Sequence, residues 1–185
     1  MAPTLETERL LIRPWRDDDV EPWIAMGLDA RVMEFFPSVY TRVEAAAAAT
    51  RMRQRLEQNG YGWWVVEVKN GTPFAGVIAL QDVPFDAHFT PALEVGWRLG
   101  YDHWGAGYAS EGARAALAYA FATLDRNEVV AMTAAINTRS QRVMQRLGMS
   151  HDAADDFDHP RLERGHRLER HVLYRLTRER FAAGA

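Results

Sequence analysis

The sequence predicts a single mixed α/β domain built on a mixed β-sheet. The chain has 185 residues, of which 48% are hydrophobic, and this size and composition suit one domain with a buried core. Strand-like segments joined by short turns occupy the middle of the chain, and a strand–helix–strand pattern follows them. Such an order is typical of a mixed sheet. Because no repeat, linker or low-complexity segment divides residues 1–185, we expect one domain.

The first predicted elements are a strand and a helix. Residues 7–13 contain the β-favouring run Leu-Leu-Ile and end at Pro14, which cannot donate a hydrogen bond within a sheet. One of the aspartates at 17–19 is expected to cap a helix that continues through Trp23, Ile24 and Met26.

A longer helix is predicted to begin at Thr41 and to reach about Leu56. Thr41 and Glu44 have the spacing of a capping box, and Asn59-Gly60 is a stop signal. The preceding residues 29–40 carry aromatic side chains that could line a pocket, although a loop covering the core is the favoured interpretation.

Three antiparallel strands are predicted next. Residues 62–68 and 74–82 flank Asn70-Gly71, which is a strong hairpin signal. Residues 93–99 form the third strand. Gly96 within it indicates a bulge or the close approach of a ligand.

The remaining predicted elements alternate strand and helix. They are a strand over 128–135, a helix beginning at 137 and ended by Gly148, an irregular acidic stretch over 152–159, a strand over 171–176 and a helical turn over 177–181.

Composition argues against several classes of protein. The chain has no cysteine, so disulfides and thiolate chemistry are excluded. The net charge of −3 argues against nucleic-acid binding, and the arginines of residues 161–180 alternate with glutamates as on a solvated face. No membrane-spanning run or signal peptide is visible, so we expect a cytoplasmic protein, monomeric or homodimeric. The histidines match no zinc pattern, so no metal site is predicted.

The most informative stretch is a glycine-bearing turn that follows the strand over 93–99. It leads into a segment, ending at about Leu124, whose composition and period predict a helix. The start of a helix offers unpaired N–H groups and partial positive charge, and Gly105 and Gly107 permit positive φ and close approach. We therefore predict a phosphate or pyrophosphate site. The alternative is a tight turn whose glycines serve only the bend.

Two common phosphate-binding motifs do not fit this turn. A P-loop needs Gly-Lys-Ser/Thr, and Lys69 is the only lysine in the chain. A dinucleotide fingerprint needs glycine or alanine where Ser110 stands.

The motif Trp-Gly-Ala-Gly-Tyr-Ala-Ser-Glu, from Trp104 to Glu111, resembles the acyl-CoA pyrophosphate loop of the GNAT superfamily of N-acetyltransferases. Trp104 occupies the first position of the loop, as in the branch resembling ribosomal-protein N-terminal alanine acetyltransferases. The resemblance covers nearly the whole chain. It implies a mostly antiparallel twisted sheet, with helices on both faces and a splayed central pair formed by the strands over 93–99 and 128–135.

The resemblance also implies that acetyl-CoA binds in that wedge. Asn137-x-x-Ser140-x-Arg142 followed by Gly148-Met149 is similar to the second motif of the superfamily, and the amide of Asn137 suits the amides of pantetheine. A plain helix cap is the alternative for Asn137. The implied cofactor-binding residues are Trp97, Leu99, Trp104, Gly105, Ala106, Gly107, Tyr108, Ala109, Ser110, Asn137, Ser140 and Arg142.

Two residues are the candidates for catalysis. Glu94 stands where several family members place a carboxylate that deprotonates the amine, and a solvated charge is the alternative. The usual tyrosine acid is absent because Met144 occupies its place. Ser140 matches the polar partner near the sulfur in the branch named above, and Tyr101 and Tyr108 are weaker substitutes.

These resemblances imply an acetyl-CoA-dependent N-acyltransferase. We expect a primary amine, either of a protein N-terminus or of a small molecule, to attack the thioester directly in a ternary complex. The alternative is a catalytically silent CoA-binding sensor or interaction domain. No nucleic acid, membrane or metal partner is expected.

Overall fold

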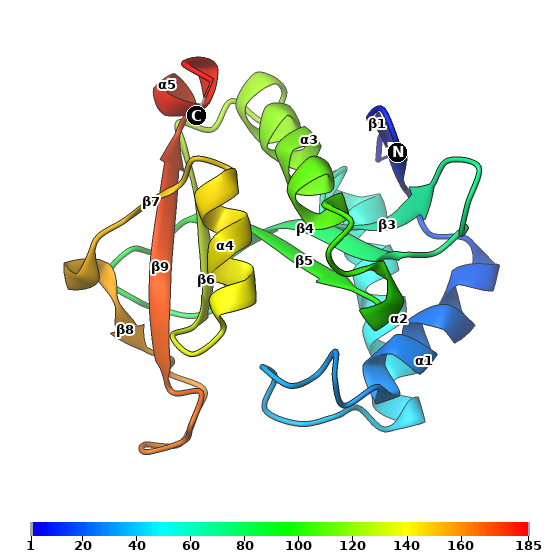
Figure 1. Ribbon diagram of the computed structural model, residues 1–185, viewed down its shortest axis with the longest axis horizontal. Helices are drawn as coiled ribbons and strands as arrows, with labels where there is room; N and C mark the ends of the chain where they lie inside the picture. The colour runs from blue at the N-terminus through cyan, green and yellow to red at the C-terminus, as the bar shows by residue number, and fades with distance from the viewer. Residues whose placement is uncertain (1, 185) are drawn as a thin grey trace.

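The computed structural model describes residues 2–184 as a nine-stranded sheet with helices on both faces (Figure 1). The strand order is β1-β2-β3-β4-β5-β6-β9-β7, and β8 pairs separately with β9. The pair β5–β6 is parallel and the other pairs are antiparallel, which confirms the predicted mixed sheet. The strands are β1 (Leu5–Glu6), β2 (Leu10–Arg13), β3 (Trp63–Val68), β4 (Gly76–Asp82), β5 (Leu93–Leu99), β6 (Glu128–Ala134), β7 (Ser150–His151), β8 (Phe157–Asp158) and β9 (Arg170–Thr177).

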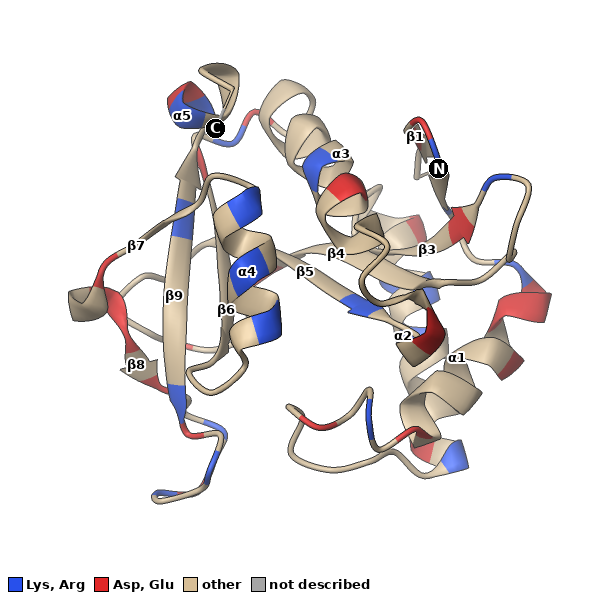
Figure 2. Ribbon diagram, in the orientation of Figure 1, with Lys and Arg blue, Asp and Glu red and all other residues tan. Residues whose placement is uncertain are grey.

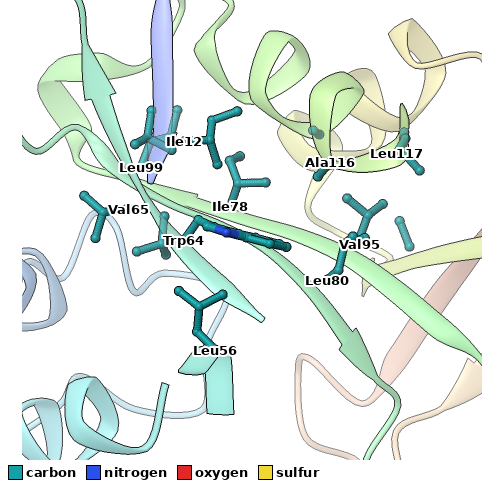
Figure 3. Close-up of a cluster of buried hydrophobic side chains, with 14 of the residues drawn as sticks. Ile12, Leu56, Trp64, Val65, Ile78, Leu80, Val95, Leu99, Ala116 and Leu117 are labelled. Atoms are coloured by element: carbon teal, nitrogen blue, oxygen red, sulfur yellow. The ribbon is translucent and has the colours of Figure 1, made fainter. Parts of the chain in front are cut away.

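Helices α1 and α3 pack on opposite faces of this sheet. A Cβ added to Gly112 of α3 would lie 2.9 Å from Ile78 Cγ1, so glycine permits this close packing. Figure 3 shows other α3 residues facing the same layer of buried side chains. On the other face, Arg98 of β5 meets Trp23 of α1. The helices are α1 (Val20–Leu28), α2 (Arg42–Asn59), α3 (Tyr108–Ala122), α4 (Thr138–Arg146) and α5 (Arg178–Ala182).

The ends of α2 follow the predicted signals. Thr41 Oγ1 accepts a hydrogen bond from the Glu44 N–H, while the Glu44 carboxylate accepts one from the Thr41 N–H. This reciprocal pair is the predicted capping box. The helix is capped at its C-terminus by Gly60, whose φ of 76° is a left-handed conformation that favours glycine.

The sheet is open between β5 and β6. Their register holds a single pair, Glu94 opposite Val130, whereas β5 pairs with β4 along its full length. The two strands diverge beyond Glu94, and the β5 edge from Val95 to Leu99 has no ladder partner on the β6 side. This confirms the splayed central pair.

Two predictions near the N-terminus are wrong in detail. The strand expected over residues 7–13 is two strands, because Thr7 forms a turn with Leu10: its N–H donates to the Leu10 carbonyl, and its Oγ1 accepts from the Leu10 N–H. Residues 17–19 form a short 3₁₀ helix. Asp19 precedes α1 but makes no capping hydrogen bond to it.

The acidic stretch over 152–159 is also more regular than expected. Residues 153–155 form a 3₁₀ turn, and Phe157 begins β8, opposite His171 of β9. Phe157 is buried in a second, smaller apolar cluster with Phe89 and Leu173. Burial of this aromatic ring explains why the segment adopts a fixed conformation.

The carboxylate of Asp19, which does not cap α1, belongs to a buried ion pair. Both Asp19 oxygens accept from the Arg13 guanidinium, at 2.8 and 2.9 Å. Glu67 and the carbonyls of Pro14 and Pro73 accept the other Arg13 hydrogen bonds. Arg13 is thus a buried cation with every direction of its guanidinium occupied.

We expect Asp19→Asn to lower the free energy of unfolding by about 3–5 kcal/mol, because it removes the buried carboxylate that pairs with Arg13 and leaves only the more exposed Glu67 to balance this charge. Asp17→Asn, in the same 3₁₀ helix, removes only an exposed pair with Arg53 and should change it by less than about 1 kcal/mol. Urea denaturation measures both. Equal small losses would show that the buried pair contributes no more than a surface one.

Candidate active site

A cavity of ≈ 690 Å³ occupies the opening between β5 and β6. One part, the glycine-turn side, is formed by residues 104–110 and α4. The other part, the loop side, is formed by Glu94, Gly96 and Arg98 of β5 together with lining residues from the segments 29–40, 83–91 and 159–168. The sequence-predicted residues on its wall are Glu94, Trp97, Leu99, Trp104, Gly105, Gly107, Tyr108, Ala109, Ser110, Asn137, Ser140 and Arg142. Ala106 does not line it.

The glycine turn presents unpaired donors to the cavity. Gly105 and Gly107 have φ of 76° and 84°, as the turn was predicted to require. No side chain caps α3 at Gly107, so the N–H groups of its first turn have no intrahelical partner. The buried Oγ of Ser110 also lacks a hydrogen-bond partner within residues 2–184. These donors and the helix dipole suit an anion.

The turn is held by contacts that sequence reasoning missed. Glu111 accepts hydrogen bonds from the Thr7 hydroxyl (2.6 Å), the Arg9 N–H (2.9 Å) and Arg9 Nε (2.7 Å). Arg9 also donates to the carbonyl of Ala106 (3.0 Å). Ala106 therefore helps to hold the glycine turn through its carbonyl. The N-terminal turn thus fixes the glycine turn from about a hundred residues away, which no local pattern could indicate.

Helix α4 lines the opposite wall with polar side chains. Asn137 Oδ1 accepts from the Ser140 N–H (3.2 Å), so Asn137 caps α4. Its Nδ2 donates to Thr133 Oγ1 and Ser140 Oγ. Figure 2 shows basic positions along α4 beside α3. Arg142 and Arg146 line the cavity and form no ion pair within the described chain, so their charge can meet an anionic ligand.

Strand β5 separates the two sides of the cavity. Arg98, Gly96 and Glu94 pair with alternate residues of β4, so they share one face, while Trp97 and Leu99 point to the other. The register at Gly96 is continuous, so the predicted bulge is absent. The Gly100 N–H donates toward β4, to Ala75. Because the N–H and C=O groups of successive strand residues point to opposite edges, those of Leu99 and Trp97 face β6. The Leu99 carbonyl accepts a hydrogen bond from Trp104 Nε1 (2.9 Å).

Glu94 is half-buried and held by a relay of hydrogen bonds. Gln81 Nε2 donates to Glu94 Oε2 (2.8 Å), and Trp63 Nε1 donates to Gln81 Oε1 (2.9 Å), which fixes the orientation of the amide. Desolvation raises the pKa of Glu94 to about 7, against the opposing effect of the Gln81 hydrogen bond. Near neutral pH, Glu94 can therefore both accept and release a proton.

Two histidines stand on the loop side. The rings of His159 and His171 lie 4.8 Å apart and line the cavity. Desolvation lowers the pKa of His171 to about 4, so this imidazole is neutral at pH 7. No group of three potential metal ligands occurs within residues 2–184. The loop side thus combines aromatic rings with the charged side chains of Glu94, Arg98 and Arg161.

Comparison with known proteins agrees with this geometry. Residues 9–150 match the family model described as "Acetyltransferase (GNAT) domain". The chain is 33% identical over 188 residues to the Aspergillus fumigatus protein named "FsC-acetyl coenzyme A-N(2)-transacetylase", covering 96% of this chain and 77% of that one.

The chain belongs to the GNAT acetyltransferase family. It is an acetyl-CoA-dependent N-acetyltransferase. Solved structures show the same GNAT fold. A Bacillus anthracis acetyltransferase of the GNAT family superposes with a TM-score of 0.78 at 24% identity, covering 96% of this chain and 99% of the other. Mycobacterium smegmatis RimJ, in complex with CoA-disulfide, superposes with a TM-score of 0.73 at 19% identity, covering 95% and 88%. No helix of residues 2–184 is long and apolar enough to span a membrane.

We expect Asn137→Ala to lower the free energy of unfolding by about 1 kcal/mol, because it removes the cap of α4. If Asn137 also binds pantetheine, Asn137→Ala should lower the affinity for acetyl-CoA as well. Asn137→Asp, which keeps the capping oxygen, should then lower this affinity by a similar factor. Thermal unfolding and calorimetry separate the two effects. Lost stability with unchanged affinity would make Asn137 a cap only.

Proposed function

We propose that this GNAT enzyme transfers the acetyl group of acetyl-CoA to the primary amine of a small molecule, by direct attack in a ternary complex. The observation that carries the proposal is the continuity of the cavity, which joins the glycine turn to Glu94 through the opening in the sheet. The name of the Aspergillus fumigatus relative describes transacetylation at an N(2) position, which supports a small amine over a protein N-terminus.

Acetyl-CoA fits the donors of the glycine-turn side. The free N–H groups from Gly105 to Ser110, with the unpartnered Ser110 hydroxyl, would hold the pyrophosphate, and Arg142 would add positive charge. Pantetheine would pair with the unpaired edge of β5 at Trp97 and Leu99. The Leu99 carbonyl accepts a hydrogen bond from Trp104, and the Leu99 N–H, a donor on the same edge, would stabilise a developing oxyanion.

The chemistry assigns roles to Glu94 and Ser140. An ammonium must lose a proton before it attacks the thioester, and Glu94, directly or through water, would accept it. Ser140 Oγ accepts a hydrogen bond from Asn137 Nδ2 (3.1 Å), so its own proton is free to be donated toward the leaving sulfur. Met144, in the place of the usual tyrosine, is buried in the core and cannot serve as the acid.

We expect Gly107→Val to abolish measurable acetyl-CoA binding while the fold persists, because the turn cannot keep its shape with a branched side chain: an added Cβ would lie 3.3 Å from Arg9 Nη2, which pairs with Glu111. Gly165→Val is the matched control: its φ is also 84°, a Cβ there meets nothing within 4 Å, and Gly165 does not line the cavity. Calorimetry gives affinity and circular dichroism gives folding. Equal affinity in the two variants would refute the pyrophosphate site.

Glu94→Gln should lower kcat/KM at pH 7 by about 10²–10⁴, with nearly unchanged acetyl-CoA affinity. The loss should shrink as the pH rises toward the pKa of the acceptor, where free amine is abundant. A uniform loss at every pH would indicate substrate positioning. Binding of acetyl-CoA by the wild type without transfer to any amine of a panel would favour a silent CoA-binding domain.

The raised pKa also links Glu94 to stability. The folded protein holds the Glu94 proton more tightly than the unfolded chain, so ionisation destabilises the fold as the pH rises through about 7. Glu94→Gln removes this effect. Its Tm relative to wild type should therefore be higher at pH 8 than at pH 5.

A further inference from the structure

Arg98 of β5 is a buried cation on the loop side of the cavity. It is 7% exposed and lines the cavity on the same face as Glu94. Its Cζ lies 3.9 Å from the ring centroid of Phe36, 5.1 Å from that of Trp23 and 5.5 Å from that of Tyr40. Within residues 2–184 it forms no ion pair, and its buried Nε and Nη1 have no hydrogen-bond partner.

The contrast with Arg13 shows that this arrangement is unusual within the chain. Arg13 is equally buried, at 4% exposed, yet Asp19, Glu67 and two carbonyls receive its N–H groups. Arg98 is instead surrounded by aromatic rings, and Tyr40 also brings its hydroxyl to the guanidinium. Arg13 therefore has its counter-ions within the protein, whereas Arg98 has none within residues 2–184.

The surrounding rings cannot replace an anion. They interact with the flat faces of the guanidinium, whereas its N–H groups point outward in the plane, and those on Nε and Nη1 remain unsatisfied. Burial lowers the pKa of Arg98 from its ordinary value, but arginine stays protonated at neutral pH. A carboxylate would neutralise this charge and at the same time accept a hydrogen bond from an unpartnered N–H.

The floor of the cavity places this cation within reach of an amine near Glu94. Arg98 and Glu94 each lie two residues from Gly96, about 6–7 Å along the strand. A Cβ on Gly96 would meet only Ala79 Cβ and Trp63 Cη2, both at 3.9 Å, so protein packing does not require glycine there. The absent side chain leaves open space between the carboxylate and the guanidinium.

We propose that Arg98 binds a carboxylate of the acceptor, so that the substrates of this enzyme are amines that also carry a carboxylate. The amine lies over Gly96 beside Glu94, and the carboxylate reaches Arg98 under the ring of Phe36, which shifts to admit it. The inference rests on the proposed amine acetylation and narrows its substrate class. It gives Phe36 and the segment 29–40 a part in acceptor binding.

Two series of acceptors that differ only at the carboxylate test this proposal. The first is phenylalanine, phenylalaninamide and phenethylamine, and the second is ornithine, ornithinamide and 1,4-diaminobutane. In at least one series, wild-type kcat/KM should be about tenfold or more higher for the carboxylate than for the decarboxylated amine. Arg98→Met should erase that ratio mainly by lowering kcat/KM for the carboxylate, and Arg98→Lys should keep part of it.

Arg31→Met is the matched control. Arg31 also stacks on a ring, with its Cζ 4.0 Å from the Tyr101 centroid, but it is exposed and paired with Asp29. This variant should keep the ratio. If wild-type kcat/KM is the same for the carboxylate and the decarboxylated amine in both series, or if Arg98→Met lowers kcat/KM equally for all members, Arg98 has only a structural role and the proposal is overturned.

A binding measurement separates this inference from the proposed function. In the CoA-loaded protein, calorimetry should give N-acetylphenylalanine an affinity about tenfold or more above that of N-acetylphenethylamine, and Arg98→Met should remove the difference. Equal affinities in wild type for this pair, and likewise for N-acetylornithine and N-acetyl-1,4-diaminobutane, would overturn the role of Arg98. If acetyl-CoA binds but no amine is acetylated, the proposed function fails, and these affinities still decide whether Arg98 recognises a carboxylate. Thermal unfolding of each variant shows whether it is folded.

Discussion

The site depends on the loss of pairing between β5 and β6 after a single register position. At Glu94 and Val130 the two strands are joined, and from there they diverge. A continuous sheet would have used the backbone groups of Trp97 and Leu99 internally and left no passage between its faces. The opening provides both a free strand edge and a connection between the glycine turn and the loop side. Glu94 lies at the closed end of this opening, so the base candidate is positioned by the strand pairing itself.

Contacts between distant segments keep this opening in shape. The Glu111 carboxylate joins the first turn of α3 to Thr7 and Arg9, and Arg98 packs the segment 29–40 onto the sheet through Phe36. Glu34 of that segment is ion-paired with Arg139 of α4, and its backbone carbonyl accepts a hydrogen bond from Arg167. Both sides of the cavity are therefore tied to the same loop.

Local physical chemistry explains which features could be predicted from sequence. The capping box at Thr41, the strands with Asn70-Gly71 between them, and the positive φ of Gly105 and Gly107 all follow from interactions within a few residues. The turn at Thr7 escaped prediction because a side-chain hydrogen bond overrides the strand-like run. The roles of Arg9, Arg13 and Arg98 depend on partners up to about a hundred residues away. Motif resemblance located Glu94, but only its burial shows why its pKa is raised.

The gap in the sheet also has a consequence for the lifetime of the folded chain. A ligand seated along the β5 edge supplies backbone-like hydrogen bonds where a neighbouring strand would normally stand, and thus links two half-sheets that otherwise meet at one position. Because such a ligand binds the folded state alone, its free energy of binding adds to that of folding. Acetyl-CoA bound at this edge would therefore raise the resistance of the protein to unfolding.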